Sequence, residues 1–342
     1  MNNQGKFINY TEKTITKEGL ENSSAWIVPK NSILYSIYAS VGFIAINNIN
    51  LSTSQAIYSI ILKDNVDINY IYYYLQNLKK NIHKYIETGT QGNLNSKIVQ
   101  NFNIKIPSLN EQKRIGNFLS LIDEKIELLE KRYEILLNIK KFYLNVIFNK
   151  FLENHKYQIF TLGEISDKLE NGYSGNQVPY KTKFPVTRIE SISTGKINYN
   201  KVGYVKNINE CYRLKKGDLL LSNINSLKHI GKTVYFEDRF PLYHGMNLIL
   251  IRINKKFNSR YIYYYIIFHQ NWFKKMACQA VNQASINQKS LKKFKIKIPE
   301  RKIQNQIEKL LYHFDLKIKI NKNRINEYKQ FKKGLLQKMF VR

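Results

Sequence analysis

Two long stretches of the chain carry apolar side chains at alternating spacings of three and four residues. One stretch begins after Pro107 and the other after Pro299. This spacing places the apolar positions along one face of an α-helix and is typical of a heptad seam. The seam positions are Ile115, Leu119, Ile122, Ile126, Leu129 and Leu136 in the first stretch, and Ile307, Leu311, Phe314, Ile318, Asn321 and Ile325 in the second. Each stretch of about 40 residues predicts a helix of about 60 Å.

Two seams of equal length in one chain most simply bury each other. The intervening segment, residues 154–299, is long enough for the second helix to run antiparallel to the first. Lys140 and Lys332 occupy equivalent seam positions, and in an antiparallel pair they lie at opposite ends, where each can extend its ammonium group to water. Asn321 is either a buried polar residue that fixes the register of the pair or a solvated interruption of the seam.

The helical stretches form part of a longer repeat. Residues 102–107 (FNIKIP) return as residues 294–299 (FKIKIP), and the YIYYY sequence at 70–74 returns at 261–265. Solenoid units recur every 20–50 residues or so, and this repeat is much longer, so it is a duplicated domain with its helix. We predict an α+β fold with two similar globular domains joined by two long antiparallel coiled-coil helices, in a pseudo-two-fold symmetric arrangement. The predicted boundaries are 1–107 and 154–299 for the globular domains, and 108–153 and 300–342 for the helices.

The second globular segment alternates strand-like runs with turn residues. These runs cover residues 186–192, 217–222, 233–236 and 247–253, and residues 261–273 have helical periodicity. A mixed α+β domain is expected. In the first segment, residues 5–10 match 195–199, so the counterpart of about 154–194 would precede Met1. We therefore expect the first domain to be either shortened or completed by another chain.

The charge of the chain points to a polyanionic partner. There are 55 Lys and Arg residues against 25 Asp and Glu, a formal net charge of +30. Nucleic acid relieves the self-repulsion of so basic a protein, and the neutralised phosphates release counterions. AT-rich codons, which encode Lys, Asn, Ile and Tyr, are another source of part of the lysine excess. The lack of a long apolar run and the presence of only two cysteines are typical of a cytoplasmic protein.

No set of residues with catalytic or metal-ligand spacing occurs in the sequence. Phosphate-binding loops, dinucleotide-binding glycine motifs and the zinc-protease motif are missing. His229 and His244 have no carboxylate or cysteine at ligand spacing beside them, and we interpret both as ordinary surface or core histidines. Asp123 and Glu124 are expected on a solvated helix face. The sequence therefore predicts a recognition protein without catalysis or a metal site of its own.

The same sequence motif stands at the start of both predicted helices. It reads IKIPSLNEQKRI at residues 104–115 and returns in degraded form at 296–307. Further segments of the same kind are residues 160–165 (FTLGEI), 216–220 (KGDLL) and 282–286 (NQASI). This ordered set, which covers essentially the whole chain, resembles the specificity (S) subunit of type I restriction–modification systems.

The resemblance implies two target recognition domains, each reading one half of a bipartite sequence in double-stranded DNA, with the paired helices setting the gap. It implies DNA methyltransferase (M) and restriction (R) subunits as partners, which would carry S-adenosylmethionine, ATP and Mg²⁺, while this chain binds no cofactor. The shortened first domain leaves a second interpretation, an inactive or half-site-only specificity protein. A third is a coiled-coil adaptor that does not bind DNA.

Base recognition in the major groove needs hydrogen-bonding side chains on loops, with Arg or Lys for guanine and Asn or Gln for adenine. Arginine is absent from residues 1–107, so the first domain is expected to use other polar side chains. The candidate DNA-binding residues there are Lys6, Tyr38, Thr90, Gln91 and Asn93. In the second domain they are Tyr173, Ser174, Asn176, Gln177, Lys181, Arg188, Asn225, Lys228, His229 and Gln283, with Lys181 on phosphate. The alternative for each is a solvated loop side chain.

Both helices also carry apolar residues outside the seam. These are Phe118, Leu121, Leu128, Ile135, Leu137 and Phe142 in the first helix, and Leu310, Ile320, Phe331 and Leu336 in the second. Surplus apolar surface of this kind either docks partner subunits or packs against the globular domains of the same chain.

Overall fold

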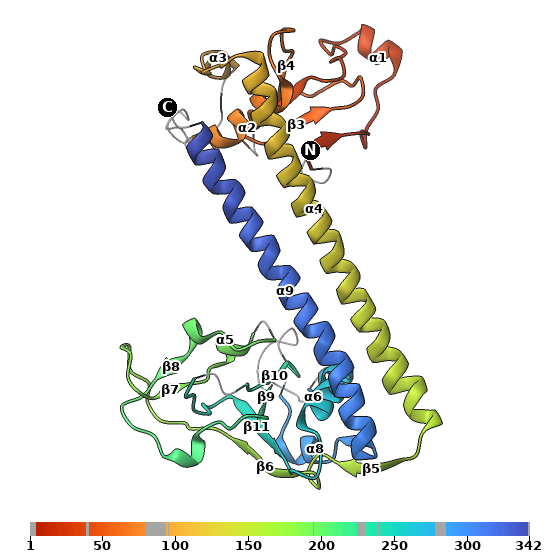
Figure 1. Cartoon of the computed structure of the whole chain (residues 1–342), viewed down its shortest axis with the longest axis vertical. Coiled ribbons are helices and arrows are strands. Elements are labelled where there is room, and N and C mark those ends of the chain that lie inside the picture. Colours follow the sequence, from red (N-terminus) through yellow and green to blue (C-terminus); the bar gives the residue numbers. More distant parts are fainter. Residues whose placement is uncertain are drawn as a thin grey trace. The chain divides into compact units, whose positions relative to one another are not determined.

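A computed structural model describes residues 5–38, 41–79, 82, 94, 96–193, 195–223, 230–237, 240–277 and 285–340. The chain divides into two compact units. Unit 1 comprises Met1–Tyr133 and Ile320–Arg342, and unit 2 comprises Glu134–Lys319. The long helices α4 (Leu109–Asn145) and α9 (Arg301–Met339) pass from one unit into the other. Each unit therefore holds one globular domain and a piece of both helices (Figure 1).

The globular domain of unit 1 is a four-stranded sheet with a tyrosine-rich helix packed against it. The strands are β1 (Phe7–Ile8), β2 (Ile33–Ser36), β3 (Ile44–Asn47) and β4 (Ile57–Ile60), in the order β1-β3-β2-β4. The helices are α1 (Lys17–Glu21), α2 (Ile68–Leu78) and α3 (Ser96–Gln100). Asp67 caps α2 by accepting from the Tyr70 N–H at 2.8 Å, which fixes where the helix begins. Tyr73 of α2 and Ile33 of β2 are fully buried in the shared core.

Unit 2 repeats three strands of this sheet, β2, β3 and β4, and adds further strands. The main sheet has the order β10-β9-β11-β6, and β5 pairs with β12 and β7 with β8. The strands are β5 (Tyr157–Thr161), β6 (Ser166–Asn171), β7 (Pro185–Val186), β8 (Gly203–Tyr204), β9 (Leu219–Ser222), β10 (Thr233–Tyr235), β11 (Leu248–Ile253) and β12 (Lys295–Pro299). The helices are α5 (Ile189–Ile192), α6 (Ser259–Phe268), α7 (Gln270–Ala277) and α8 (Gln288–Lys292). After α4 the chain continues through a π-helical turn, Val146–Phe151, and a 3₁₀ turn, Leu152–Asn154.

The two sheets share one strand register. Ile33 pairs with Ile60 in unit 1, as Leu219 pairs with Ile251 in unit 2. The third strand of each sheet is also equivalent, because β3 pairs antiparallel with β2 as β10 does with β9. The sequence repeat therefore reflects a structural duplication, and the predicted α+β class is confirmed.

Within each unit, the pieces of α4 and α9 pack antiparallel. In unit 1, Asp123 of α4 meets Lys332 of α9, while Leu129, farther along α4, meets Asn321, which lies earlier in α9. The Asn321 side chain is buried and donates to the Leu129 carbonyl at 2.7 Å. These two residues are equivalent positions of the repeat, 192 apart. Asn321 is therefore a buried seam residue and not a solvated interruption.

Most of the predicted seam positions are buried. Fully or nearly fully buried are Leu119, Ile122, Ile126, Leu129, Ile307, Leu311, Ile318, Asn321 and Ile325, whereas Ile115, Leu136 and Phe314 are half-buried. Of the apolar residues outside the seam, Leu336 is also buried, in the core of unit 1, where it contributes to the helix pair and the domain together. The others stay on the surface: Phe118, Leu121, Leu128, Ile135, Leu137, Phe142, Leu310, Ile320 and Phe331.

Candidate nucleic-acid interface

A polar loop on unit 2, residues 172–177, lies beside Arg188, and together they hold four of the predicted DNA-binding residues. Tyr173, Ser174, Gln177 and Arg188 line one cavity of about 190 Å³. They come from the segment that follows β6 and from the residues just before α5. Ser174, Gln177 and Arg188 are exposed, and Tyr173 is half-buried. A hydroxyl pair, an amide and a guanidinium thus face one space, a combination suited to hydrogen bonding with base edges.

Close backbone contacts hold the loop in place. The Tyr173 N–H donates to the His244 carbonyl at 2.8 Å, and the Met246 N–H donates to the Tyr173 carbonyl at 2.9 Å. Only glycine fits at position 172, because a Cβ there would collide with the Gly245 carbonyl. The Tyr173 ring also packs edge-on against Tyr212, with centroids 5.6 Å apart. The backbone of the loop is therefore fixed while its polar side chains face outward.

The side chains of Gln177 and Arg188 both pack against Gly203. A Cβ on Gly203 would collide with the Gln177 carboxamide and approach the Arg188 side chain within 3.2 Å. Arg188 has one carboxylate neighbour, Glu190, at 3.6 Å, and both side chains are about half exposed (49% and 61%). An exposed pair of this length is weak, so the guanidinium is free to exchange Glu190 for another acceptor.

The residue whose carbonyl accepts from the Tyr173 N–H is a buried histidine, His244. His244 is fully buried, and its Nε2 lies 3.1 Å from the Leu248 carbonyl oxygen. Within the described part of the chain, its Nδ1 has no hydrogen-bond partner. Burial lowers the pKa of His244 to about 4, so the ring is neutral near pH 7. The interpretation of His244 as a core histidine is confirmed, whereas His229 lies outside the described residues.

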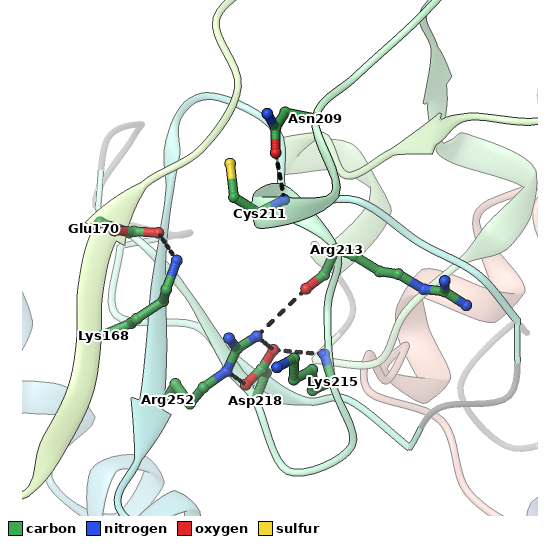
Figure 2. Close-up of polar contacts among 8 residues, drawn as sticks. All are labelled: Lys168, Glu170, Asn209, Cys211, Arg213, Lys215, Asp218 and Arg252. Atoms are coloured by element: carbon green, nitrogen blue, oxygen red, sulfur yellow. Dashed lines mark hydrogen bonds and ion pairs between the residues drawn. The ribbon is translucent and has the colours of Figure 1, made fainter.

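A second polar cluster anchors the KGDLL segment of unit 2 (Figure 2). Asp218 is buried and accepts two hydrogen bonds from Arg252, at 2.8 and 2.6 Å, and one from the Lys215 N–H at 2.7 Å. These hydrogen bonds raise the pKa of Arg252 above its usual value. The pair joins the turn before β9 to β11 and leaves Arg252 little capacity for another anion. Lys215, Lys216 and Lys255 line the adjacent groove, which has a volume of about 650 Å³.

The remaining candidates are scattered or lie outside the described residues. Tyr38, Asn176 and Lys181 are exposed. Lys6 instead points into unit 1, where its ammonium donates to Asn69 at 2.7 Å and to Ser120 at 2.9 Å. Burial lowers the pKa of Lys6 to about 8. The structure does not describe Thr90, Gln91, Asn93, Asn225, Lys228, His229 or Gln283, whose roles stay predictions.

Each globular domain meets the long helices through a group of polar residues that we call the joint. The sequence did not predict these contacts. Asp123 was expected on a solvated face, which is wrong, because it is partly buried between Lys332 at 2.6 Å and the Tyr73 hydroxyl at 2.8 Å. In unit 2, Asp315 takes the same place between Lys140 at 2.6 Å and the Tyr264 hydroxyl at 2.7 Å. Both lysines are therefore ion-paired inside their units and do not extend to water. The sequence did contain a signal for this joint, because Asp123 and Lys140 recur in the second copy as Asp315 and Lys332.

A buried glutamine completes each joint. Gln112 accepts from the Asp67 N–H at 2.9 Å and donates to the Pro107 carbonyl at 2.9 Å. Gln304 makes the same bonds in unit 2, to the Asn258 N–H at 2.9 Å and to the Pro299 carbonyl at 2.8 Å. The glutamine of the repeated phrase thus ties the start of the long helix to the cap of the domain helix.

Neither a membrane span nor a metal cluster is found in the described parts of both units. No helix there combines the length and the apolar character needed to cross a bilayer. Nor does any group of three or more His, Cys, Asp or Glu side chains there have the arrangement of a metal site.

Comparison with curated proteins gives relatives that share one function. The family model for the type I restriction modification DNA specificity domain matches residues 1–138 and 154–330. The putative type I restriction enzyme MjaX specificity subunit of Methanocaldococcus jannaschii is 41% identical over 194 residues, which is 54% of this chain and 46% of that protein. The MjaVIII specificity subunit of the same organism is 25% identical over 296 residues, 79% of this chain and 69% of that protein. The match to MjaX thus spans about half of each protein.

Solved structures share the fold. The crystal structure of a type I restriction–modification S subunit from M. genitalium superposes with a TM-score of 0.67 at 20% identity, covering 98% of this chain and 88% of that one. A chain from a structural study of type I restriction–modification complex assembly gives a TM-score of 0.59 at 15% identity, covering 94% and 85%. The family match extends over both halves of the repeat and includes Gln112 and Gln304, which tie the long helices to the domain helices. The chain belongs to the family of DNA specificity subunits of type I restriction–modification systems.

Proposed function

We propose that this chain reads a bipartite DNA sequence for a type I restriction–modification complex, with one globular domain on each half-site. The observation that carries the proposal is the convergence of Tyr173, Ser174, Gln177 and Arg188 on one cavity of unit 2. Among the described residues, the side chains of Ser174 and Gln177 make no hydrogen bond to other parts of the chain, so their donors and acceptors are free for bases. Gln suits adenine and Arg suits guanine in the major groove.

The distribution of charge supports contact with phosphates. Arg252 is neutralised by Asp218, and Arg260 by Glu237 at 2.9 Å and Glu308 at 3.4 Å. The excess positive charge of the chain therefore lies largely on exposed lysines, such as Lys181 beside the polar loop. Lysines on phosphates position a domain on DNA without specifying the sequence.

The exposed apolar residues of the helices are a docking surface for other subunits. In unit 1, Phe118, Leu121 and Leu128 of α4 are 43%, 61% and 62% exposed. In unit 2, Phe142 of α4 and Leu310 of α9 are exposed as well. Side chains of this size on a rigid helix are typical of protein–protein interfaces. We propose that M subunits bind there, and that S-adenosylmethionine, ATP and Mg²⁺ act on the M and R subunits while this chain supplies recognition alone.

One observation favours a half-site reader as the second candidate. Among the predicted DNA-binding residues of unit 1 that the structure describes, Lys6 is engaged by Asn69 and Ser120, and Tyr38 alone is exposed. In that case unit 2 alone would specify bases, and unit 1 would contribute nonspecific contacts.

Selection of DNA duplexes from a randomised library tests these proposals. The chain, assembled with its methyltransferase partner, is expected to enrich two short motifs separated by a fixed gap. Gln177→Ala and Arg188→Ala should each relax one base pair of one motif, at a cost of about 1–3 kcal/mol. The matched controls, Gln330→Ala and Arg324→Ala on the exposed face of α9, should leave both motifs unchanged.

The outcomes separate the candidates. A single enriched motif would favour the half-site reader. No enrichment, together with binding that does not weaken as salt rises, would favour an adaptor without DNA recognition. Motifs unchanged by both loop substitutions would contradict the assignment of base recognition to the polar loop.

A further inference from the structure

A basic groove lies on unit 2 at the end of the main sheet opposite the polar loop. The turn before β9, the segment after β11 and the beginnings of α6 and α9 line this groove, whose volume is about 650 Å³. Its exposed cations are Lys215, Lys216, Lys255 and Arg301.

The strand directions fix the separation of the basic groove from the polar loop. Both β6 and β9 pair antiparallel with β11, so β6 and β9 run in the same direction. The polar loop follows the end of β6, whereas the lysines of the groove precede the start of β9. The two features therefore lie at opposite ends of the sheet, about 20 Å apart along the six residues of β11.

The positive charge of the groove is largely uncompensated. Arg252 and Arg260 also line it, but carboxylates already neutralise both of them. In the part of unit 2 that the structure describes, none of the four exposed cations has an ion pair. The remaining carboxylate of the lining, Asp167, accepts from the Asn254 amide at 2.7 Å. Four cations thus face one free carboxylate, an arrangement that attracts an anion.

Two of the cations stand on a fixed turn. Buried Asp218 accepts from the Lys215 N–H at 2.7 Å and from the Arg252 guanidinium at 2.6 Å, as Figure 2 shows. Gly217 has φ +96°, a left-handed conformation that favours glycine. The backbone that carries Lys215 and Lys216 is therefore held in place before any ligand binds, which lowers the cost of ordering it on binding.

Unit 1 has the same turn without the charge. The shared strand register aligns residues 29–32 with 215–218 and residue 64 with 255, and the sequence repeat aligns residue 109 with 301. The counterparts of the four exposed cations are Pro29, Lys30, Asp64 and Leu109. One lysine and one aspartate cancel there, so the shared fold does not require the charge of the basic groove.

The lining favours phosphate groups over a protein partner. Its exposed residues are the four cations and Asp167, whereas its larger apolar residues, Tyr235, Ile253 and Phe257, are buried or half-buried. Protein interfaces have an apolar core and are depleted of lysine. Lysines bind the phosphates of DNA through charge alone, with the release of counterions.

We propose that the basic groove binds backbone phosphates of duplex DNA outside the half-site read by the polar loop. The choice of DNA as the ligand rests on the proposed function, but the contact itself requires no reading of bases. Because the groove is about 20 Å from the polar loop, its phosphates come from the flank of the same duplex or from a second duplex. The contact adds affinity that is independent of sequence and falls as salt rises.

The salt dependence of binding to DNA without the selected motifs tests the groove. The probe is a labelled duplex of about 30 base pairs, and the protein is the full chain assembled with its methyltransferase partner. A variant with glutamine in place of Lys215, Lys216 and Lys255 should lower the slope of log affinity against log salt by about 2–3, since each phosphate contact contributes about 0.9. The control carries the same loss of charge at exposed positions of α9, and its slope should change by less than about 0.5. The control substitutions are Lys317→Gln, Lys322→Gln and Lys333→Gln.

A pair of single substitutions compares the two units directly. Lys216→Gln should lower the slope by about 1, whereas Lys30→Gln, at the exposed counterpart in unit 1, should leave it unchanged. An unchanged slope for the triple groove variant, an equal loss in the α9 control, or equal effects of the single substitutions would overturn the proposal. Binding of polyglutamate that the groove variant loses, with an unchanged slope for DNA, would overturn it in favour of an acidic protein partner.

A second labelled duplex identifies the source of the phosphates. If it binds a chain already saturated with target DNA, and the groove variant loses this binding, the groove holds a second duplex. If it does not bind, a loss of slope in the groove variant assigns the phosphates to the flank of the same duplex. A chain that selects no motif but loses slope in the groove variant would contradict base reading alone. A chain that selects its motifs with an unchanged slope in that variant would contradict the groove alone.

Discussion

The ammonium group of Lys332 lies 2.6 Å from a carboxylate oxygen of Asp123, although the two residues are 209 positions apart. Their side chains are 14% and 28% exposed. The Tyr73 hydroxyl also donates to this carboxylate, so one aspartate joins α4 to α9 and to the domain helix α2. Lys140, Asp315 and Tyr264 repeat the arrangement in unit 2. Each globular domain is thus fixed to the long helices by an ion pair shared with a tyrosine.

Asp123→Asn should destabilise unit 1, because it leaves Lys332 partly buried without its counter-charge. We expect a loss of about 2 kcal/mol in the free energy of unfolding, less than for a fully buried pair because both side chains retain some solvent contact. Urea denaturation, with hydrogen exchange to locate the effect, is the measurement. The exposed neighbour Glu124→Gln should change stability by less than about 0.5 kcal/mol. Equal effects of the two substitutions would contradict a structural role for the pair.

Gln112→Ala should be costly for a similar reason. The Asp67 N–H and the Pro107 carbonyl would each lose a buried partner, at about 1–3 kcal/mol per unsatisfied group. Gln304→Ala should have a comparable effect in unit 2, whereas the exposed Gln330→Ala should have little. Thermal unfolding of the three variants tests this expectation. A stable Gln112→Ala chain with unchanged exchange at α2 would show that the joint does not depend on this residue.

Asn321→Leu is expected to stabilise the helix pair of unit 1 by about 1 kcal/mol. The side chain is buried opposite Leu129, its apolar equivalent in the repeat, and a buried polar residue in a seam costs stability in return for register. Thermal unfolding measures the gain, and the exposed Asn323→Leu is the control. A drop in the melting temperature of Asn321→Leu alone would mean that the hydrogen bond to Leu129 outweighs the cost of burying the amide.

The stability of unit 2 should fall in mild acid because of His244. Its pKa is lowered from 6.5 to about 4 in the folded protein, so the unfolded chain binds more protons between these two values. Stability is complete above about pH 6.5 and declines as the pH falls toward 4, by on the order of 3 kcal/mol from this group. His244→Gln should flatten the pH dependence of urea unfolding in this range, and the exposed His313→Gln should not. An unchanged slope for His244→Gln would rule out His244 as its source.

The helices and the duplication could be predicted from the sequence because both are expressed in local patterns. A heptad spacing fixes which face of α4 and α9 is buried, and the repeated phrases fix the correspondence between the two domains. The pairing of Asp123 with Lys332 could not be predicted in the same way. It depends on an antiparallel alignment that brings distant positions together, and Asp123 alone has the appearance of a solvated helix residue.

The candidate DNA-binding residues also differ in whether a local sequence pattern could predict their position. Tyr173, Ser174 and Gln177 are close in sequence, and a polar loop after a strand was enough to predict them together. Arg188 joins them because β7 and the Gly203 backbone bring it under the loop, which no spacing in the sequence indicates. The sequence predicts Lys6 as a DNA contact, but in the structure its ammonium group donates to Asn69 of α2 and Ser120 of α4, and a contact so distant in sequence has no local signal.

Sequencing of modified bases in the host genome, with and without this gene, tests the bipartite-reader proposal most directly. We predict that deletion removes methylation from one motif made of two specified parts and a fixed unspecified gap, and that reintroduction of the chain restores it. A pattern of methylation that is the same in both strains would contradict the proposal that this chain directs a methyltransferase to DNA.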